Sequence, residues 1–229
     1  MTKKRLAIFD IDGTIFRSSL LIELVKTLIA EGVFPASMPR EYERPFRAWL
    51  DRQGSYDDYI QVVVKSFEKH ISGVPYQTYA QAARKVVSYQ KNHTYRYTRN
   101  LVGELVSKGY YVLAISHSPR EVVNEFCRRL GFSKVYARLL EIDSKQRLTE
   151  RVLYDKLIND KEKVLKRALQ KEQLTLQGSI GVGDTESDIP FLKMVHKPIC
   201  FNPNKKLYDM ARRRDWKIVV ERKDVIYNL

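Results

Sequence analysis

The sequence contains little cysteine. Its two cysteines, Cys127 and Cys200, lie far apart, and neither has metal-ligand spacing around it. This count argues against a disulfide scaffold and fits a reducing compartment. We expect both side chains to be buried as small apolar groups.

Long apolar runs are absent as well. No stretch approaches the ~18 apolar residues that a membrane span requires. The first residues, MTKKR, lead into a short run that ends in aspartate, without the apolar core of a signal peptide. No internal repeat or low-complexity tract is visible. We therefore expect a soluble, cytoplasmic protein without a membrane partner.

Acidic residues are fewer than basic ones, 27 against 41, which gives a formal net charge of +14. Such an excess is compatible with nucleic-acid binding. The basic residues are nevertheless spread along the chain, with local clusters at residues 161–171 and 212–214, and helical faces of mixed charge are usually solvated. Since no aromatic-basic motif accompanies them, we do not expect specific nucleic-acid binding. The oligomeric state stays open.

The chain does contain enough apolar residues, 44% of the total, to bury a sizeable core. Short apolar runs alternate with amphipathic segments, which predicts a mostly parallel sheet with helices on both faces. The expected strands are residues 5–11, 110–116, 134–138, 178–184, 197–202 and 216–220, the last of which closes the chain. Residues 139–154 alternate in the manner of a hairpin or flap.

A helical block interrupts this alternation after the first strand. Its four segments, at 19–32, 40–53, 56–71 and 76–90, are linked by Gly or Pro residues that act as stop and turn signals. We interpret the block as an insertion into the α/β domain. The core is then expected at residues 1–16 and 92–229, and the insertion at residues 17–91.

Polar residues end three of the expected strands: Asp10 and Asp12, then Ser116, then Asp184 with Asp188 following. Parallel strands bring such residues to one edge of the sheet. Two carboxylates ~4 Å apart repel by about 4 kcal/mol at an effective dielectric of ~20, so this cluster needs a cation. Oxygen ligands without His or Cys favour magnesium. A carboxylate can also attack phosphorus and form an aspartyl-phosphate.

Four motifs in order resemble those of the haloacid dehalogenase-like (HAD) superfamily, in its phosphatase branch. They are "DIDGT" at 10–14, the serine that ends "LAIS", the lysine that starts "KEKVLKRAL", and "GVGDTESD" at 181–188. The insertion resembles the helical cap of the phosphoserine phosphatase-like subgroup (subfamily IB). The resemblance implies an α/β fold with a Rossmann-like three-layer core and an inserted all-helical cap domain. It also implies a phosphoric monoester hydrolase that uses Mg²⁺ and an aspartyl-phosphate to hydrolyse a small phosphorylated metabolite.

The resemblance also implies the roles of single residues. Asp10 is expected to be the nucleophile, and Asp12 the general acid and base. The implied metal ligands are Asp10, Asp12 (through its main-chain carbonyl), Asp184 and Asp188. The implied phosphate-binding residues are Gly13, Thr14, Ser116, His117 and Lys161, with Lys163 as a rival for the lysine role.

The identity of the substrate stays open. Phosphoserine phosphatases of this subgroup carry a glutamate that recognises the substrate amine; the matching position here is Ser19, and Glu23 lies about one helical turn further on. This departure disfavours phosphoserine. The candidates for facing the pocket are Arg17, Arg44, Arg47 and Tyr56, which would favour an anionic or aromatic substrate.

Two other function classes are alternatives. One is a phosphatase or binding protein that acts on nucleic-acid ends. The other is a non-catalytic domain that merely accepts a phosphoryl group, as receiver domains do. Receiver domains lack both the second aspartate, here Asp12, and the large insertion, so these features favour the enzyme.

Overall fold

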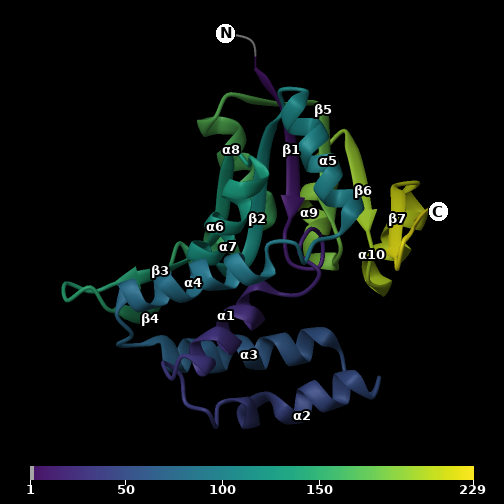
Figure 1. The fold of residues 1–229 in the computed structure, drawn as a ribbon. Helices are drawn as coiled ribbons and strands as arrows, with labels where there is room; N and C mark the ends of the chain where they lie inside the picture. Colours follow the sequence, from purple (N-terminus) through teal and green to yellow (C-terminus); the bar gives the residue numbers. More distant parts are fainter. Residues whose placement is uncertain (1–2) are drawn as a thin grey trace.

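The computed structural model describes residues 3–229. Its strands are β1 (Lys4–Asp10), β2 (Tyr111–Pro119), β3 (Lys134–Ile142), β4 (Leu148–Leu153), β5 (Leu174–Gly183), β6 (Lys197–Phe201), β7 (Lys217–Arg222) and β8 (Val225–Asn228). In the described residues they form one sheet in the order β4-β3-β2-β1-β5-β6-β7-β8 (Figure 1). The pairs β3–β4 and β7–β8 are antiparallel, and the other pairs are parallel. The predicted mostly parallel sheet is confirmed.

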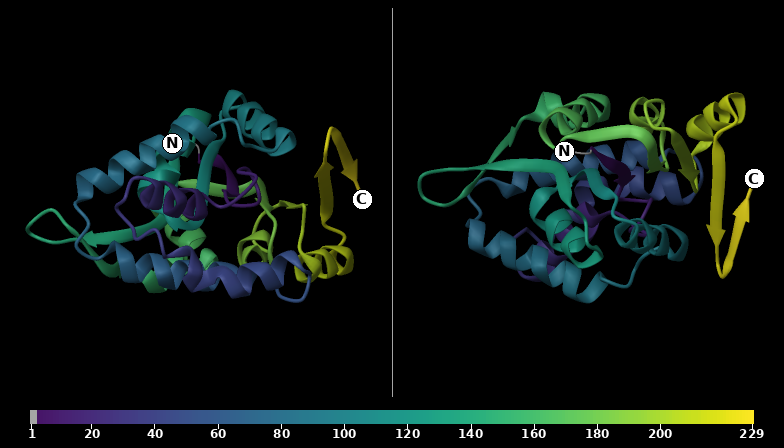
Figure 2. Two further views of the ribbon diagram at one scale, coloured as in Figure 1. Left: turned by 60° about the horizontal axis from the view of Figure 1, so that its bottom comes forward. Right: turned by 90° about the horizontal axis from the view of Figure 1, so that it is seen from above.

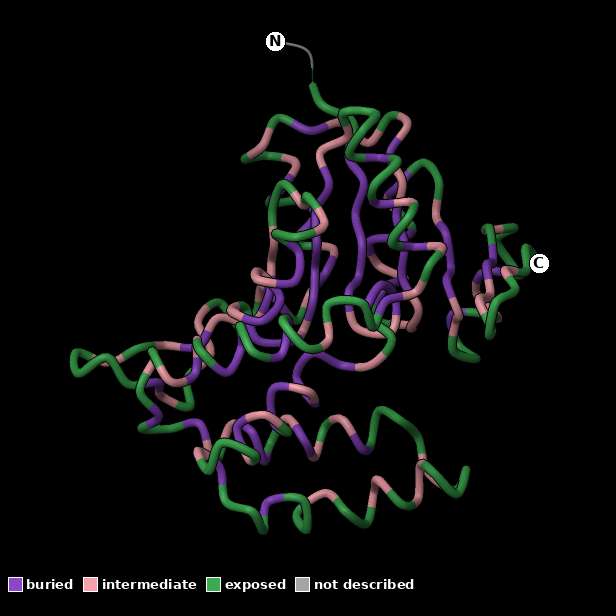
Figure 3. Tube along the Cα trace, in the orientation of Figure 1, coloured by how far each residue is buried: buried purple, intermediate pink, exposed green. Residues whose placement is uncertain are grey.

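Helices cover both faces of the sheet. Those outside the insertion are α5 (Arg96–Ser107), α6 (Arg120–Leu130), α7 (Asp155–Ile158), α8 (Lys161–Lys171), α9 (Ile189–Leu192) and α10 (Lys205–Arg214), with a short 3₁₀ helix at Glu186–Asp188. Successive side chains of β1 point to opposite faces. Leu6 and Ile8 pack in the cluster that contains α8, α9 and α10, whereas Ala7 and Phe9 pack in the cluster that contains α5 and α6. The result is a three-layer α/β core whose central strands are buried (Figure 3).

The insertion consists of four helices, α1 (Leu20–Ala30), α2 (Pro39–Leu50), α3 (Tyr56–Ile71) and α4 (Tyr76–Gln90). In Figure 1, α1, α2 and α3 lie below the carboxyl end of β1. Buried residues of α1, α3 and α4 belong to the same apolar cluster as one face of the sheet. We call these four helices the cap. The predicted α/β fold with an inserted helical cap is confirmed, whereas the limits of the two domains remain a prediction.

The β3–β4 hairpin leaves the core and reaches the cap, as the views in Figures 1 and 2 show. At its far end it pairs with the connection between α3 and α4. The Gly73 N–H donates to the Leu148 carbonyl (2.8 Å), the Leu148 N–H to the Val74 carbonyl (2.9 Å), and the Tyr76 N–H to the Gln146 carbonyl (2.9 Å). The hairpin predicted at 139–154 is therefore present, and it also holds one corner of the cap.

One predicted boundary is wrong. The strand at 216–220 was expected to close the chain, but the structure adds β8 after a tight turn at Lys223, whose φ is +55°. β8 has four residues and lies at the sheet edge; Val225, Tyr227 and Asn228 are exposed, and only Ile226 packs on the core. Such a short, weakly buried strand carries little hydrophobic pattern, so the sequence does not reveal it.

Among the described residues, no helix combines the length and the apolar character that crossing a bilayer requires.

Candidate active site

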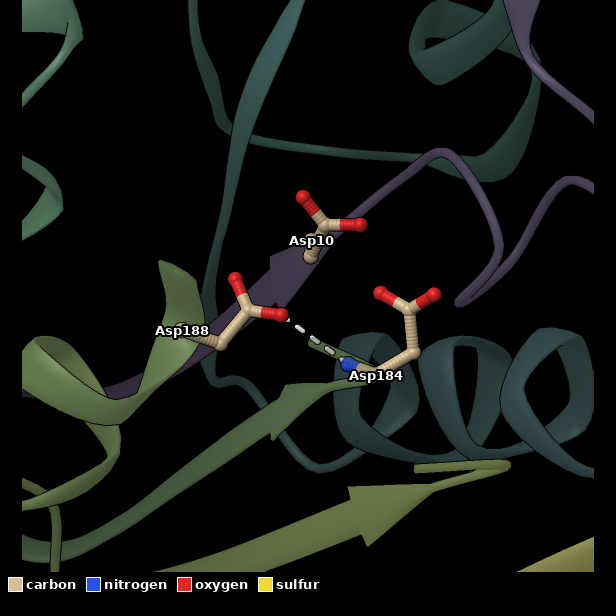
Figure 4. Close-up of side chains that lie close together, drawn as sticks. All are labelled: Asp10, Asp184 and Asp188. Carbon is tan, nitrogen blue, oxygen red and sulfur yellow. Dashed lines mark hydrogen bonds between the residues drawn. The ribbon is translucent and has the colours of Figure 1, made fainter. Parts of the chain in front are cut away.

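Three carboxylates meet at the carboxyl edge of the sheet. Asp10 is the last residue of β1, Asp184 follows β5, and Asp188 ends the 3₁₀ helix next to it. Each offers an oxygen within 4.8 Å of the oxygens of the other two (Figure 4). They come together because β1 and β5 are parallel neighbours, so their carboxyl ends lie side by side. We call Asp10, Asp184 and Asp188 the acidic triad.

Two glycines make room for this triad. A Cβ on Gly13 would lie 2.2 Å from a carboxylate oxygen of Asp184, and one on Gly183 would lie 2.5 Å from the side chain of Asp188. Gly13 also has a φ of +81°, which side chains rarely allow. Any larger residue at either position would displace a carboxylate of the triad.

Lys161 is a cation that the protein itself places against the acidic triad. It is the first residue of α8, is 3% exposed, and its Nζ lies 2.7 Å from Asp10 Oδ1 and 2.5 Å from Asp188 Oδ1. Although burial opposes its charge, these two carboxylates raise the pKa of Lys161 above its usual value. The rival Lys163 points elsewhere, because its Nζ pairs with Asp160 (2.9 Å) at the surface. Of the two candidates, Lys161 is therefore the lysine within the site.

One lysine does not balance three carboxylates. Burial, with the neighbouring Asp188 and Asp12 carboxylates, raises the pKa of Asp10 to about 8 despite the attraction of Lys161. Burial and the charges of Asp10 and Asp188 raise the pKa of Asp184 well above its usual range. A divalent cation would relieve this excess, and an all-carboxylate donor set suits a hard ion. The triad therefore fits a divalent metal, in agreement with the predicted class of cofactor.

The Asp12 side chain turns away from the triad toward the cap. Its Oδ1 accepts from the Leu20 N–H (2.6 Å) and its Oδ2 from the Ser116 hydroxyl (2.7 Å). Burial of this carboxyl group raises its pKa. Asp12 thus sits between the end of β2 and the first turn of α1.

Ser118 also binds the first turn of α1, and the sequence analysis did not identify it. Its hydroxyl accepts from the Leu21 N–H (3.1 Å), so Asp12 and Ser118 together hold the first two free N–H groups of α1. Ser19, which occupies the N-cap position, makes no side-chain cap hydrogen bond. The second serine of "SHS" directly after a strand was the signal available in the sequence.

The expected phosphate-binding residues all lie near the triad, but three of them besides Lys161 have partners within the protein. The Gly13 N–H donates to the Phe16 carbonyl (2.9 Å), and the Thr14 hydroxyl donates to Asp184 (3.1 Å). The Ser116 hydroxyl donates to Asp12, as described above. In this structure Thr14 therefore orients a carboxylate of the triad.

His117 lines the cleft beside Lys161. Burial, together with the positive charges of Lys161 and Arg138, lowers the pKa of His117 to about 4. Its Nε2 is buried and has no hydrogen-bond partner among the described residues. The ring is thus neutral at pH 7.

A cleft of about 2160 Å³ connects these residues to the cap. Arg17 and Tyr56 line it, as the sequence reasoning anticipated, whereas Arg44 and Arg47 do not. Glu23 is also outside the lining, since it pairs with Lys26 (2.9 Å). The cap therefore contributes one wall of the cleft, and α1 brings no acidic side chain to it.

Comparison with known proteins gives consistent matches. The family model of haloacid dehalogenase-like hydrolases matches residues 7–193. A histidinol-phosphatase of Neisseria meningitidis serogroup C (strain 8013) is 24% identical, covering 94% of this chain and 98% of the relative. The solved structure of a protein of unknown function from Bordetella pertussis Tohama I superposes with a TM-score of 0.72 at 19% identity, covering 95% of this chain and 98% of the other.

A phosphoserine phosphatase, solved as a phospho-aspartyl intermediate analogue, superposes with a TM-score of 0.64 at 20% identity over 97% of this chain and 96% of the other. These structures confirm the fold. The family match and the phosphatases among the relatives confirm the predicted enzyme class, a phosphoric monoester hydrolase. With its four motifs gathered at one sheet edge, the chain belongs to the haloacid dehalogenase-like hydrolase family.

Proposed function

We propose that the protein is a magnesium-dependent phosphatase that hydrolyses a small-molecule phosphomonoester through an aspartyl-phosphate on Asp10. One observation carries the proposal: a buried lysine bridges the carboxylates of Asp10 and Asp188 at the floor of an open cleft. A purely structural ion pair would not require two further carboxylates, Asp184 and Asp12, around it. Phosphoryl transfer does require such a cluster, because the nucleophile, the charge-neutralising groups and the acid must converge.

In the proposed reaction, Asp10 attacks phosphorus while Lys161 Nζ stays bonded to its other oxygen and reaches the phosphoryl oxygens. The bond from phosphorus to the ester oxygen breaks, and Asp12 gives its proton to the leaving alkoxide. Asp12 then takes a proton from water as that water attacks the phosphorus of the aspartyl-phosphate. Inorganic phosphate leaves and Asp10 is restored. Positioned carboxylates are suited to both tasks, nucleophilic attack by Asp10 and general acid–base catalysis by Asp12.

The metal is proposed to be Mg²⁺. It would be held by the acidic triad and the main-chain carbonyl of Asp12. When bound, it supplies positive charge to the phosphoryl oxygens and to the crowded carboxylates. The Thr14 hydroxyl fixes the orientation of Asp184 for this purpose.

The substrate is proposed to be a small phosphorylated metabolite, which the relatives' names, histidinol-phosphatase and phosphoserine phosphatase, support. Phosphoserine itself stays disfavoured. Ser19 stands where that subgroup carries its amine-recognising glutamate, and Glu23 is turned away toward Lys26.

Hydrolysis of an aryl phosphate tests the proposal. We expect the purified protein to release phosphate with Mg²⁺ and to lose this activity with EDTA or in the Asp10→Asn variant. Circular dichroism would check that the variant is folded. Full activity of Asp10→Asn would refute the role of Asp10.

The intermediate can be trapped separately. In the Asp12→Asn variant, an activated aryl phosphate has a good leaving group that needs no acid, so the aspartyl-phosphate should form while turnover stays very low. Mass spectrometry should show one added phosphoryl group on the peptide that contains Asp10. Its absence from that peptide would count against the covalent pathway.

A further inference from the structure

The charges that line the cleft are unevenly partnered. Six carboxylates line it outside the acidic triad and Asp12: Glu43, Asp57, Asp58, Glu68, Asp155 and Glu186. Each has a hydrogen-bond or ion-pair partner within the protein. For example, Glu68 binds Arg138 (2.8 Å) and Glu186 binds Lys206 (2.7 Å). Glu43, Glu68 and Glu186 thus have cationic partners, whereas the partners of Asp57, Asp58 and Asp155 are uncharged side chains.

Three cations of the lining also have no charged partner. Arg17, Arg40 and Lys65 have no carboxylate within ion-pair distance among residues 3–229. Unpaired charge of both signs therefore lines the cleft, and these three cations are its positive part. A ligand that carries negative charge beyond its reacting phosphoryl group could pair with one of these cations.

Arg17 is the one of these three that does not lie on a cap helix, since Arg40 is on α2 and Lys65 on α3. It lies on the loop after Asp12, and its own N–H donates to the His93 carbonyl (3.0 Å). Its guanidinium lies 5.5 Å from the centre of the Tyr95 ring, which in turn packs against Phe201 at 4.9 Å. An arginine supported on an aromatic ring loses less freedom when it binds an anion.

On the side of α1, the opposite charge lacks a comparable receptor. A substrate ammonium group would need a carboxylate there, and the N-cap residue of α1 is Ser19. Glu23 is bound to Lys26 and Gln90, outside the cleft lining. α1 therefore offers no carboxylate to a substrate ammonium group.

We propose that Arg17 is a specificity-determining residue that binds a second anionic group, a carboxylate or a phosphate, on the alcohol half of the substrate. This inference rests on the proposed function, and it narrows the substrate class to phosphomonoesters with two anionic groups. The fork of N–H donors on arginine suits either group.

Two matched pairs of substrates test it. The first is 3-phosphoglycerate against glycerol 3-phosphate, which differ by a carboxylate. The second is propane-1,3-diol bisphosphate against its monophosphate. We expect kcat/KM to favour the anionic member of at least one pair by about tenfold or more, as a charge-assisted hydrogen bond would give. The pair that shows the preference identifies the anionic group.

The variants then assign the preference to Arg17. Arg17→Gln should bring the ratio within the preferred pair close to one, and Arg17→Lys should keep part of it. Arg44→Gln, a matched change outside the cleft lining, should leave the ratio as in the wild type.

Two outcomes would contradict the inference: no preference in either pair, or an equal loss on both members in Arg17→Gln, which would place Arg17 on the reacting phosphoryl group. An aryl phosphate measured alongside separates a failure of this inference from a failure of the proposed function. If it is hydrolysed and the preference is absent, Arg17 is wrongly assigned. If no ester is hydrolysed at all, the proposed function itself fails.

Discussion

Two lysines on the first turn of α8 have opposite surroundings. Lys161 is buried against Asp10 and Asp188, whereas Lys163 pairs with Asp160 at the surface with 67% of its side chain exposed. An exposed ion pair contributes little, while a buried charge that faces a reacting group contributes much. The two positions therefore form a natural pair of test and control.

We expect Lys161→Met to lower kcat by about 100-fold or more, since it removes a buried positive charge next to the proposed nucleophile Asp10. Lys163→Met should remain close to the wild type. Steady-state hydrolysis of an aryl phosphate with Mg²⁺ measures both. Because Lys161→Met leaves two carboxylates without their partner, thermal unfolding must confirm that the variant is folded. The opposite ranking of the two variants would assign the site lysine to Lys163.

At the scale of elements, α1 is held to the core by its first turn. Its leading N–H groups are bound by Asp12 and Ser118, residues on other parts of the chain. A capping oxygen normally comes from the preceding residue, and here that residue, Ser19, makes no such bond. The hydrogen bonds at the N-terminus of α1 therefore also attach the cap helices to the core beside the site.

Ser118→Ala should lower the free energy of unfolding by about 1 kcal/mol, because the Leu21 N–H then loses its partner at a buried helix end. Ser19→Ala should cost less, since no capping bond is lost. Urea unfolding of both variants gives the comparison. Equal losses would mean that the long-range cap contributes nothing beyond ordinary packing.

The β3–β4 hairpin holds the other end of the cap. Besides its backbone pairing, Arg138 on β3 donates to Glu68 on α3 (2.8 Å), and the arginine side chain is only 15% exposed. An ion pair shielded from water in this way is stronger than one at the surface.

A double-mutant cycle with Glu68→Gln and Arg138→Gln measures this contact. We expect a coupling free energy of about 1–2 kcal/mol between the two sites, from urea unfolding of the four proteins. Strictly additive effects would show that the two side chains do not interact in solution. The exposed pair Glu104 and Lys108 provides a reference cycle, for which a coupling below about 0.5 kcal/mol is expected.

At the scale of the whole molecule, His117 links stability to pH. The pKa of His117 falls from 6.5 to about 4 on folding, so between these values the unfolded chain binds more protons than the folded one. Stability from this group is therefore complete above pH 6.5 and is lost progressively as the pH falls from 6.5 to 4, by up to about 3 kcal/mol.

His117→Gln should remove that part of the pH dependence. Unfolding free energies measured from pH 4 to 7 should rise with pH more steeply in the wild type than in the variant. Parallel curves would show that the ring is hydrated and charged in the folded protein.

Much of the site was predictable because its residues end strands. Asp10, Asp184 and Ser116 follow apolar runs, and parallel strands bring their carboxyl ends to one edge. Which acceptor each hydroxyl group binds was not predictable from the sequence. Thr14 and Ser116 were expected on phosphate, and the structure pairs them with Asp184 and Asp12, because a buried hydroxyl takes the nearest acceptor that the fold offers.

The sequence by itself determined the α/β class, the helical insertion and the order of the four motifs, since these depend on local periodicity and on residue types. Only the tertiary structure decided that Lys161 and not Lys163 enters the site, that Ser118 caps α1, and that the Arg17 side chain faces the cleft with no carboxylate partner among residues 3–229. Such choices depend on which side chains meet across the fold. Spacing along the chain does not contain that information when two candidates lie within one helical turn.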